Sequence, residues 1–450
     1  MNLFSAYIQQ DGGHIPQPVE RRLPERKREM ALSNVRGSVD RKRLLILTAD
    51  AGFGHRSAAN AVAAAIEEHY GDLCEVNIVN PLEDRRAPFF LRDSQSDYDK
   101  LVRRLPELYR LGYETSDAVV PAAIVEQTLT VLLFEVMRDI VRTYRPDAIL
   151  TTYPLYQSPL RAVMTITRSS IPLLVSITDL ATVHRLWFSS SVDLSLAPTN
   201  LVRDLALNYG LSPDQVQVTG IPVNPEVVCE KRSPVEIRLA LGWKPEPITV
   251  LAVGSRRVDR LVDTLNILNH FGKPLQLAIV AGKDEKLYRE LQEIEWHVPV
   301  KIYDYVENVP VLMKAADFIV CKAGGLIITE ALACGRPLIL IDAIPGQETG
   351  NADYVVQNGA GDLVRSTMEV LETVSHWLMD DGRILNERAE NARRLGRPNA
   401  AYEVANALWL AAQRSLANVP GARGTGRLRL VDLLTRNQIN LDDDPSSHVE

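Results

Sequence analysis

Cysteine is scarce in this chain, and an excess of basic charge is missing. The 450 residues include only four cysteines, which lie far apart and form no C-x-x-C pair: Cys74, Cys229, Cys321 and Cys334. This spacing argues against a disulfide framework and a cysteine zinc site, and it fits a reducing cytosol. The formal net charge of −7 argues against a general nucleic-acid binder, whose binding surface would be basic.

A long uncharged apolar run is also missing. The longest apolar stretch, residues 118–141, contains Glu126 and Glu135, which fall on opposite sides of a helix. We therefore expect a buried or interfacial helix there and no membrane span. Residues 1–10 have no basic leader before their short apolar patch, so a secretory signal is not expected and the protein is expected in the cytoplasm.

What the chain does have is a repeated order of short β-rich runs, turns and helical stretches. One series covers residues 41–225 and a second covers residues 248–417, with a Pro-rich and charged linker at 226–247. Strands that alternate with helices predict an α/β fold with parallel sheets, here two Rossmann-like, doubly wound domains that face each other across a cleft. Residues 1–40 are predicted to be a flexible arm and residues 418–450 a disordered tail.

The most informative segment lies between residues 317 and 351. A predicted strand (317–321) leads through small residues into a predicted helix (326–334), which is the local geometry that presents backbone N–H groups to a phosphate. The next strand (337–341) leads to a loop of hydrogen-bonding side chains. The candidate nucleotide-sugar residues of this segment are Lys322, Ala323, Gly324, Gly325, Glu330, Gln347 and Glu348. A structural salt bridge for Glu330 and a solvated loop at 347–348 stay open.

A second glycine-bearing turn follows the first predicted strand. Gly52 and Gly54 allow a ligand to approach the backbone, and His55 has the side chain of a general base. A nucleotide-binding turn with an incidental histidine is the alternative. Asp179 follows another strand and could orient His55, bind an acceptor hydroxyl or cap a helix. Trp187 and Phe188 could belong to the core or line an apolar acceptor groove.

The turn after the first strand of the second series has a single glycine. Gly254, Ser255 and Arg256 occupy the position where a phosphate-binding turn belongs, and the arginine could pair with a phosphate. Solvated surface arginines remain the alternative.

Four blocks of this sequence resemble glycosyltransferase family 28, specifically the monogalactosyldiacylglycerol synthases and related diacylglycerol glucosyltransferases. The blocks are residues 50–56 (DAGFGHR), 179–188 (DLATVHRLWF), 218–223 (VTGIPV) and 322–361, which includes the PGQETGN run that ends at Asn351. The second block looks closer to the galactolipid synthases than to the peptidoglycan N-acetylglucosaminyltransferases of the same fold. Two positions differ from the family pattern: Phe53 replaces a usual glycine, and the turn at Gly254 is poor in glycine.

The resemblance implies a GT-B fold and an inverting, metal-independent transfer of a hexose from a UDP-sugar to diacylglycerol. His55 would be the base and Asp179 a residue near the acceptor. The backbone of Val306 would meet the uracil, and residues 322–325 the diphosphate. Glu330 would bind the ribose, and Gln347 with Glu348 the hexose; Asn351 belongs to the same donor-binding block. No cofactor is expected besides the UDP-hexose substrate. Galactose is favoured and glucose stays open, because the two hexoses differ at one hydroxyl.

A diacylglycerol acceptor implies peripheral binding to the inner face of a membrane. Leaving the bilayer costs ~0.8 kcal/mol for each exposed CH₂ group. The segment from Leu91 to Tyr113 carries five basic residues among leucine, tyrosine and proline, and is the candidate for contact with an anionic membrane surface. A solvated charged loop is the alternative. The sequence indicates no protein partner. Two other functions stay open: a transferase of the same fold with another lipid-linked acceptor, and a nucleotide-sugar-binding protein without catalysis.

Overall fold

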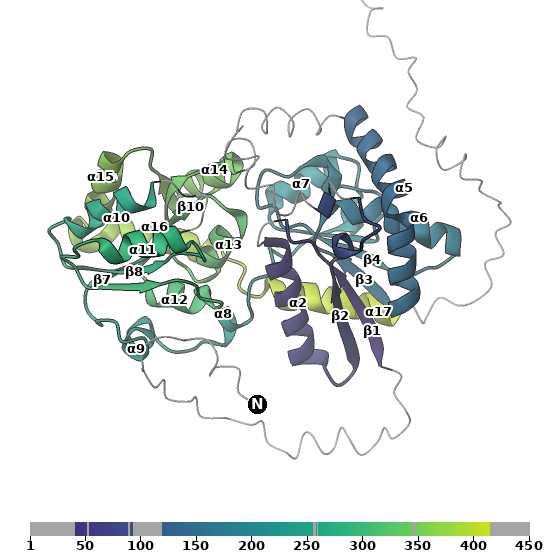
Figure 1. Ribbon diagram of the computed structural model, residues 1–450, viewed down its shortest axis with the longest axis horizontal. Coiled ribbons are helices and arrows are strands. Elements are labelled where there is room, and N and C mark those ends of the chain that lie inside the picture. Colours follow the sequence, from purple (N-terminus) through teal and green to yellow (C-terminus); the bar gives the residue numbers. More distant parts are fainter. Residues whose placement is uncertain are drawn as a thin grey trace, which may run out of the picture. The chain divides into compact units, whose positions relative to one another are not determined.

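The computed structural model describes residues 41–51, 54–88, 91–92, 119–254, 258, 260–344 and 348–414; the side chains of 119–125 are not described. Within these ranges the chain forms two six-stranded sheets, and all the strand pairs are parallel (Figure 1). We call the part built on the first sheet the first lobe and the part built on the second sheet the second lobe. The prediction of two doubly wound α/β units is therefore confirmed.

The first lobe has the strand order β2-β1-β3-β4-β5-β6. The order reverses between β1 and β3, and in such sheets ligands bind beyond the carboxyl ends of the strands at this switch point. The strands are β1 Lys42–Leu47, β2 Cys74–Val79, β3 Ala148–Thr151, β4 Leu173–Ser176, β5 Leu194–Ala197 and β6 Val216–Val218. The helices are α2 Gly54–Tyr70, η2 Pro81–Glu83, α5 Val119–Tyr144, η3 Pro154–Tyr156, α6 Gln157–Thr167, η4 Arg185–Trp187, α7 Asn200–Asn208 and η5 Pro213–Gln215.

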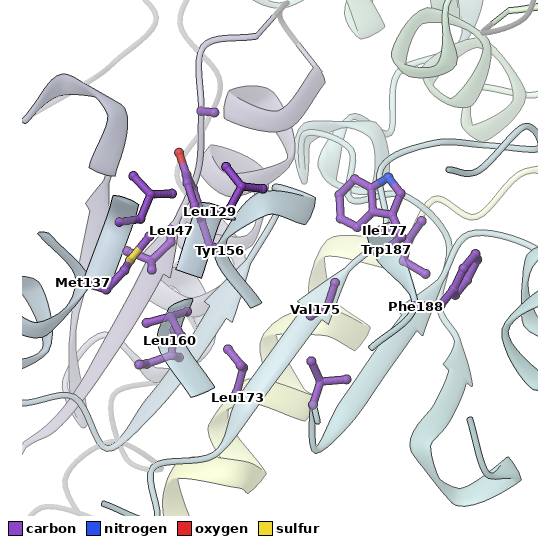
Figure 2. Close-up of a cluster of buried hydrophobic side chains, with 14 of the residues drawn as sticks. Leu47, Leu129, Met137, Tyr156, Leu160, Leu173, Val175, Ile177, Trp187 and Phe188 are labelled. Atoms are coloured by element: carbon purple, nitrogen blue, oxygen red, sulfur yellow. The ribbon is translucent and has the colours of Figure 1, made fainter. Parts of the chain in front are cut away.

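Alternate side chains of the strands supply two hydrophobic cores, one on each face of the first sheet. Leu45 and Leu47 of β1 pack in a cluster with α5 and α6, whereas Leu44 and Ile46 pack in a cluster with α2. This alternation is the period-two pattern of a strand buried on both sides. In Figure 2, side chains of β4 lead toward Ile177 and Trp187 at the carboxyl end of the strand.

Helix α5 confirms the expectation of a partly buried helix. Leu133 and Met137 are buried in the first core, while Val131 on the opposite side is 73% exposed. Among the helices that the structure describes, none combines the length and the apolar character that crossing a bilayer requires.

The second lobe has the strand order β12-β11-β10-β7-β8-β9, with its switch point between β10 and β7. Its strands are β7 Ile248–Val253, β8 Leu275–Val280, β9 Val300–Tyr303, β10 Phe318–Lys322, β11 Leu338–Asp342 and β12 Gly361–Leu363. Its helices are α8 Glu226–Cys229, α9 Pro234–Ala240, α10 Leu261–Asn269, α11 Glu285–Glu293, α12 Val309–Ala315, α13 Gly325–Ala333, α14 Thr349–Gln357, α15 Thr367–Trp377, η6 Asp380–Gly382 and α16 Arg383–Leu395.

The predicted linker at 226–247 is folded against the second lobe. Helices α8 and α9 pack on α12, and Ile237 and Trp243 are buried in the same core as β10 and α13. Ser233 and Glu236 form a capping box that fixes the start of α9. Because its apolar residues are buried, this segment is part of the second lobe and not a free hinge.

The last described helix also departs from the prediction. α17, Ala400–Arg414, was expected in the second unit, but it packs against α2, β1 and β3 of the first lobe (Figure 1). Val404 and Leu408 of α17 are fully buried in the cluster that contains Leu44 and Ile46. The second unit therefore ends with α16. The predicted arm at 1–40 and tail at 418–450 lie outside the described residues.

Candidate active site

His55 lies at the switch point of the first sheet. It is the second residue of α2, directly beyond β1, and its ring is partly buried. Its Nδ1 lies 2.8 Å from the backbone oxygen of Thr152, just beyond β3, and 2.7 Å from Oγ1 of Thr178, just beyond β4. A carbonyl oxygen can only accept, so Nδ1 carries the proton and Nε2 keeps its lone pair. Among the described residues, Nε2 has no hydrogen-bond partner.

The environment of His55 keeps the imidazole neutral. Burial lowers the pKa of His55 to about 4, and the hydrogen bond to the Thr152 carbonyl partly opposes this shift. The ring of Tyr153 stands edge-on at 5.0 Å between centroids, and the indole of Trp187 lies at 6.1 Å. At neutral pH the arrangement therefore presents an unprotonated Nε2.

Asp179 lies beside Trp187 and does not begin a helix. Its Oδ2 accepts a 2.7 Å hydrogen bond from Nε1 of Trp187, and the residues that follow it form bends. Helix capping, the alternative for Asp179, is therefore wrong. Burial raises the pKa of Asp179 to about 6, and the indole N–H opposes this shift. Trp187 and Phe188 are 1% and 7% exposed and belong to the core, which excludes them as the lining of an open groove in this structure.

The N-terminus of α13 has open backbone donors. Its N-cap is Gly324, which has no side chain to accept from the first N–H groups of the helix. The first backbone hydrogen bond of the helix runs from Ile328 N to Gly324 O at 3.1 Å. Within the described chain, the N–H groups of Gly325, Leu326 and Ile327 thus have no backbone partner. Such a terminus favours negative charge. The strand, the turn and the helix start that were predicted around Gly324 and Gly325 are present, and phosphate binding there stays a prediction.

Side chains from β10 and from the start of α14 lie close to this terminus. Lys322 forms an ion pair with Glu348, whose other carboxylate oxygen accepts from Ile344 N at 3.0 Å. Asn351 donates from Nδ2 to the Ala323 oxygen at 3.1 Å. Its Oδ1 is buried and has no partner among the residues described. Lys322, Ala323, Gly324, Glu348 and Asn351 therefore lie together, as the sequence predicted.

Contacts also join this terminus to the first lobe. A Cβ placed on Gly325 would lie 3.6 Å from the Thr178 oxygen and 3.9 Å from Leu180 N. Leu180 is 4% exposed and packs in the core cluster of the second lobe. Thr178, which contacts the His55 ring, is therefore also close to the N-terminus of α13.

Glu330 is a buried carboxyl on α13. Its exposure is 8%, and it has no hydrogen bond or ion pair within the described part of the chain, so the alternative of a structural salt bridge is not supported. Burial raises the pKa of Glu330 to about 8. An unpaired, neutral carboxyl at this depth is a candidate acceptor for ligand hydroxyls.

The remaining candidates are Val306, Gly54, Gly254 and four residues that lie outside the described ranges. Val306, between β9 and α12, is half-buried, and its backbone groups have no partner among the described residues. Gly54 opens α2, and no atom lies within 4 Å of a Cβ added there. Gly254 is buried, and a Cβ added there would lie 2.8 Å from Cδ2 of Leu261 and from Cδ2 of Leu287, so packing explains the glycine. Gly52, Ser255, Arg256 and Gln347 lie outside the described residues.

Sequence reasoning did not single out Thr152 and Thr178, which contact His55 directly. The available signal was positional. Each threonine is the last residue of a predicted strand of the first series (148–152 and 173–178), at the sheet edge where binding residues gather.

Solved structures of similar fold support the architecture. The chain resembles MurG from Acinetobacter baumannii with a TM-score of 0.53 and 17% identity, covering 82% of this chain and 99% of that one. It also resembles the glycosyltransferase SnogD from Streptomyces nogalater, with a TM-score of 0.51 and 15% identity over 83% of this chain and all of SnogD. The fold is therefore GT-B, as predicted.

Two family profiles and many relatives match the sequence. Residues 55–223 match the monogalactosyldiacylglycerol synthase family, and residues 248–404 match the C-terminal domain of glycosyltransferase family 28. The chloroplastic monogalactosyldiacylglycerol synthase of Spinacia oleracea is 34% identical over 82% of this chain and 72% of its own length. Monogalactosyldiacylglycerol synthase 3 of Arabidopsis thaliana is 32% identical over 84% and 83%, respectively. The chain belongs to the monogalactosyldiacylglycerol synthase family of glycosyltransferases.

Proposed function

We propose that the protein transfers a hexose, with galactose preferred, from a UDP-sugar to the free hydroxyl of diacylglycerol and so makes a membrane glycolipid. The observation that carries the proposal is the unprotonated Nε2 of His55, on a ring that contacts Thr178, whose backbone oxygen is close to the open N-terminus of α13. The family relationship supplies the substrate class. The acceptor hydroxyl is then matched by Nε2 of His55, and the negative diphosphate of the donor by the open N–H groups of α13.

The proposed reaction is an inverting displacement in which the acceptor oxygen attacks the anomeric carbon opposite the UDP. The hydroxyl proton passes to Nε2 of His55, the bond from the anomeric carbon to the UDP oxygen breaks, and UDP leaves with the electron pair. A pKa of about 4 makes free His55 a weak base. A negative diphosphate bound nearby raises this pKa, so the imidazole becomes a stronger base when the donor is present.

The donor is proposed to bind along α13. The open N–H groups at Gly325, Leu326 and Ile327, with the ammonium of Lys322, stabilise the charge that develops on the diphosphate, so no metal ion is required. Glu330 accepts from the ribose hydroxyls, and the backbone of Val306 pairs with the uracil. Gln347 and Glu348 bind the hexose. Binding both substrates in one place supplies a large part of the acceleration.

The test is a comparison of donors and acceptors with the unmodified protein. Thin-layer analysis of lipids made from diacylglycerol and labelled UDP-galactose or UDP-glucose identifies the hexose, and added EDTA tests the independence from metal. His55→Ala is expected to lower turnover at least ~100-fold, because it removes the base, while UDP binding stays within about twofold. UDP release with a lipid-pyrophosphate acceptor in place of diacylglycerol would favour the rival transferase. UDP binding without turnover on any lipid would overturn catalysis.

A further inference from the structure

The imidazole of His55 has a fixed tautomer, and two threonines are responsible. Thr152 contacts His55 at two points. Its backbone oxygen accepts from Nδ1 at 2.8 Å, and its hydroxyl donates to the backbone oxygen of His55 at 3.0 Å. Thr178 Oγ1 lies 2.7 Å from the same Nδ1. Because Nδ1 is already protonated for the carbonyl, the Thr178 oxygen faces the N–H as a second acceptor.

Within the ranges that the structure describes, no carboxylate bonds to Nδ1 of His55. Asp179 is the neighbour of Thr178 in sequence and was a candidate for orienting His55, but its Oδ2 accepts from the indole of Trp187. The structure gives no hydrogen bond between Asp179 and His55 among the residues it describes. The groups that contact Nδ1 of His55 are therefore a backbone carbonyl and a hydroxyl, both neutral, which leaves the ring uncharged.

Thr178 is close both to His55 and to the proposed donor site. Its side chain is 7% exposed, so the position of its hydroxyl is fixed by packing. Its backbone oxygen lies 3.6 Å from where a Cβ of Gly325 would be, at the first residue of α13. One residue thus contacts the imidazole with its hydroxyl and has its backbone oxygen close to the first residue of α13.

We propose that Thr178 is a positioning residue that holds the His55 imidazole with Nε2 toward the acceptor and sets its distance from the N-terminus of α13. This inference rests on the proposed function of His55 as the base. It predicts that loss of the hydroxyl impairs the chemical step and leaves donor binding unchanged, since the backbone contact with α13 remains.

The experiment compares Thr178→Val, which keeps the shape and removes the hydroxyl, with Thr178→Ser, which keeps the hydroxyl. Thr219→Val is the matched control: Thr219 is a fully buried threonine just beyond β6, and its hydroxyl bonds only to the Gly220 oxygen among the described residues. Thr178→Val is expected to lower kcat about 3- to 10-fold, the usual weight of one hydrogen bond. KM for the UDP-hexose and the Kd for UDP should stay within about twofold, and Thr178→Ser should recover most of kcat.

A second measurement does not need turnover. Nitrogen-15 NMR of the imidazoles, with His55→Asn to assign the signal, is expected to show Nδ1–H and unprotonated Nε2 in the native protein. The Nδ1–H signal should shift in Thr178→Val and stay in place in Thr219→Val. A native Nε2–H tautomer, or a Thr178→Val variant with unchanged kcat, would overturn the inference. An inactive native protein with the expected tautomer would overturn the proposed function and leave the assignment of Thr178 to His55 intact.

Discussion

Glu330 is a single residue that lowers the stability of the fold and that we propose binds the ribose. A carboxyl that is 8% exposed and has no partner in the described chain is an unfavourable core residue, and burial raises its pKa to about 8. Below pH 4.5 both the folded and the unfolded states hold the proton, and no stability is lost. Between pH 4.5 and 8 the unfolded state ionises and the folded state does not. Stability therefore falls as the pH rises through this range and levels off above it.

Glu330→Gln is expected to be more stable than the native protein at pH 8, with a difference that shrinks toward pH 5. The gain is of the order of a few kcal/mol, since one pKa unit corresponds to about 1.4 kcal/mol. Above pH 8 UDP binding should weaken about tenfold, because the amide cannot ionise to the charged acceptor that the Glu330 carboxyl becomes once the pH exceeds its pKa of about 8. Thermal melting and calorimetry across pH 5–9 measure both effects.

Glu372→Gln, an exposed glutamate on α15, is the control for this change. Its melting temperature should follow that of the native protein at every pH. A Glu330→Gln variant that melts lower than the native protein at pH 8, or binds UDP equally well, would contradict the proposed role of Glu330.

Single residues were predictable from the sequence where a motif made them conspicuous. The structure places Lys322 at the carboxyl end of β10 and Glu348 at the start of α14. His55 and Glu330 lie on α2 and α13, the helices that follow β1 and β10. Thr178 was not predicted, because a threonine after a strand is common and the adjacent Asp179 is a stronger chemical signal. Which of two neighbours contacts a histidine depends on backbone direction at the end of β4, and the sequence does not specify that direction.

At the scale of elements, the bends that follow β4 make contact with two helices of the second lobe. Leu180 packs into the second-lobe core near α13. Gly350, in the first turn of α14, approaches Thr182 so closely that an added Cβ would lie 2.0 Å from its Oγ1 and 3.2 Å from its backbone nitrogen. The helix therefore needs glycine at this position for the contact between the two lobes.

Gly350→Ala is expected to displace the bends around Thr182 from α14 and to lower kcat/KM about tenfold or more, because small displacements of reacting groups are costly. The effect on folding should be small, since the contact is local. The double variant Gly350→Ala with Thr182→Ala removes the nearest atom and should regain most of the activity. Steady-state kinetics and melting curves measure this. Equal activity of Gly350→Ala and the native protein would show that the contact is dispensable.

Most strands and helices could be predicted from the sequence, because apolar residues recur with a different spacing in strands and in helices. Helix α13 was predicted within one residue of its observed limits, Gly325–Ala333. The linker was misjudged because α8 and α9 are too short for a period to be clear. The sequence also did not predict which sheet α17 packs against. Its apolar face, with Val404, Leu408 and Ala412, indicates a buried helix but does not specify the sheet.

At the scale of the molecule, the chain crosses between lobes twice, and the two crossing segments touch. Gly220, which follows β6 with φ of +93°, would place a Cβ 2.5 Å from the Cβ of Arg397, just before α17. Tyr402 of α17 donates to Glu68 of α2, 2.7 Å away, and its oxygen lies 3.5 Å from Sγ of Cys229 in α8. Helix α17 thus packs on the first lobe, close to the segment by which the chain leaves that lobe after β6.

The proposed acceptor implies one more property, which is binding to a membrane. Diacylglycerol has two acyl chains and stays in the bilayer, so we expect the protein to bind the bilayer surface to reach the hydroxyl. The basic segment from Leu91 to Tyr113 is our candidate for this contact; apart from Leu91 and Arg92 it lies outside the described residues. We expect flotation with vesicles to increase with anionic lipid and to decrease with salt, as electrostatic surface binding requires.

Charge reversal locates the membrane contact. Arg103→Glu with Arg104→Glu in the basic segment should reduce flotation on anionic vesicles several-fold, since each basic residue near such a surface contributes about 1 kcal/mol. Lys286→Glu with Arg289→Glu changes the charge equally on exposed side chains of α11 in the second lobe, and should leave flotation near the native value. If both pairs reduce flotation alike, net charge and not a local surface controls binding. Flotation that ignores salt and lipid charge would exclude an electrostatic contact altogether and require an apolar anchor instead.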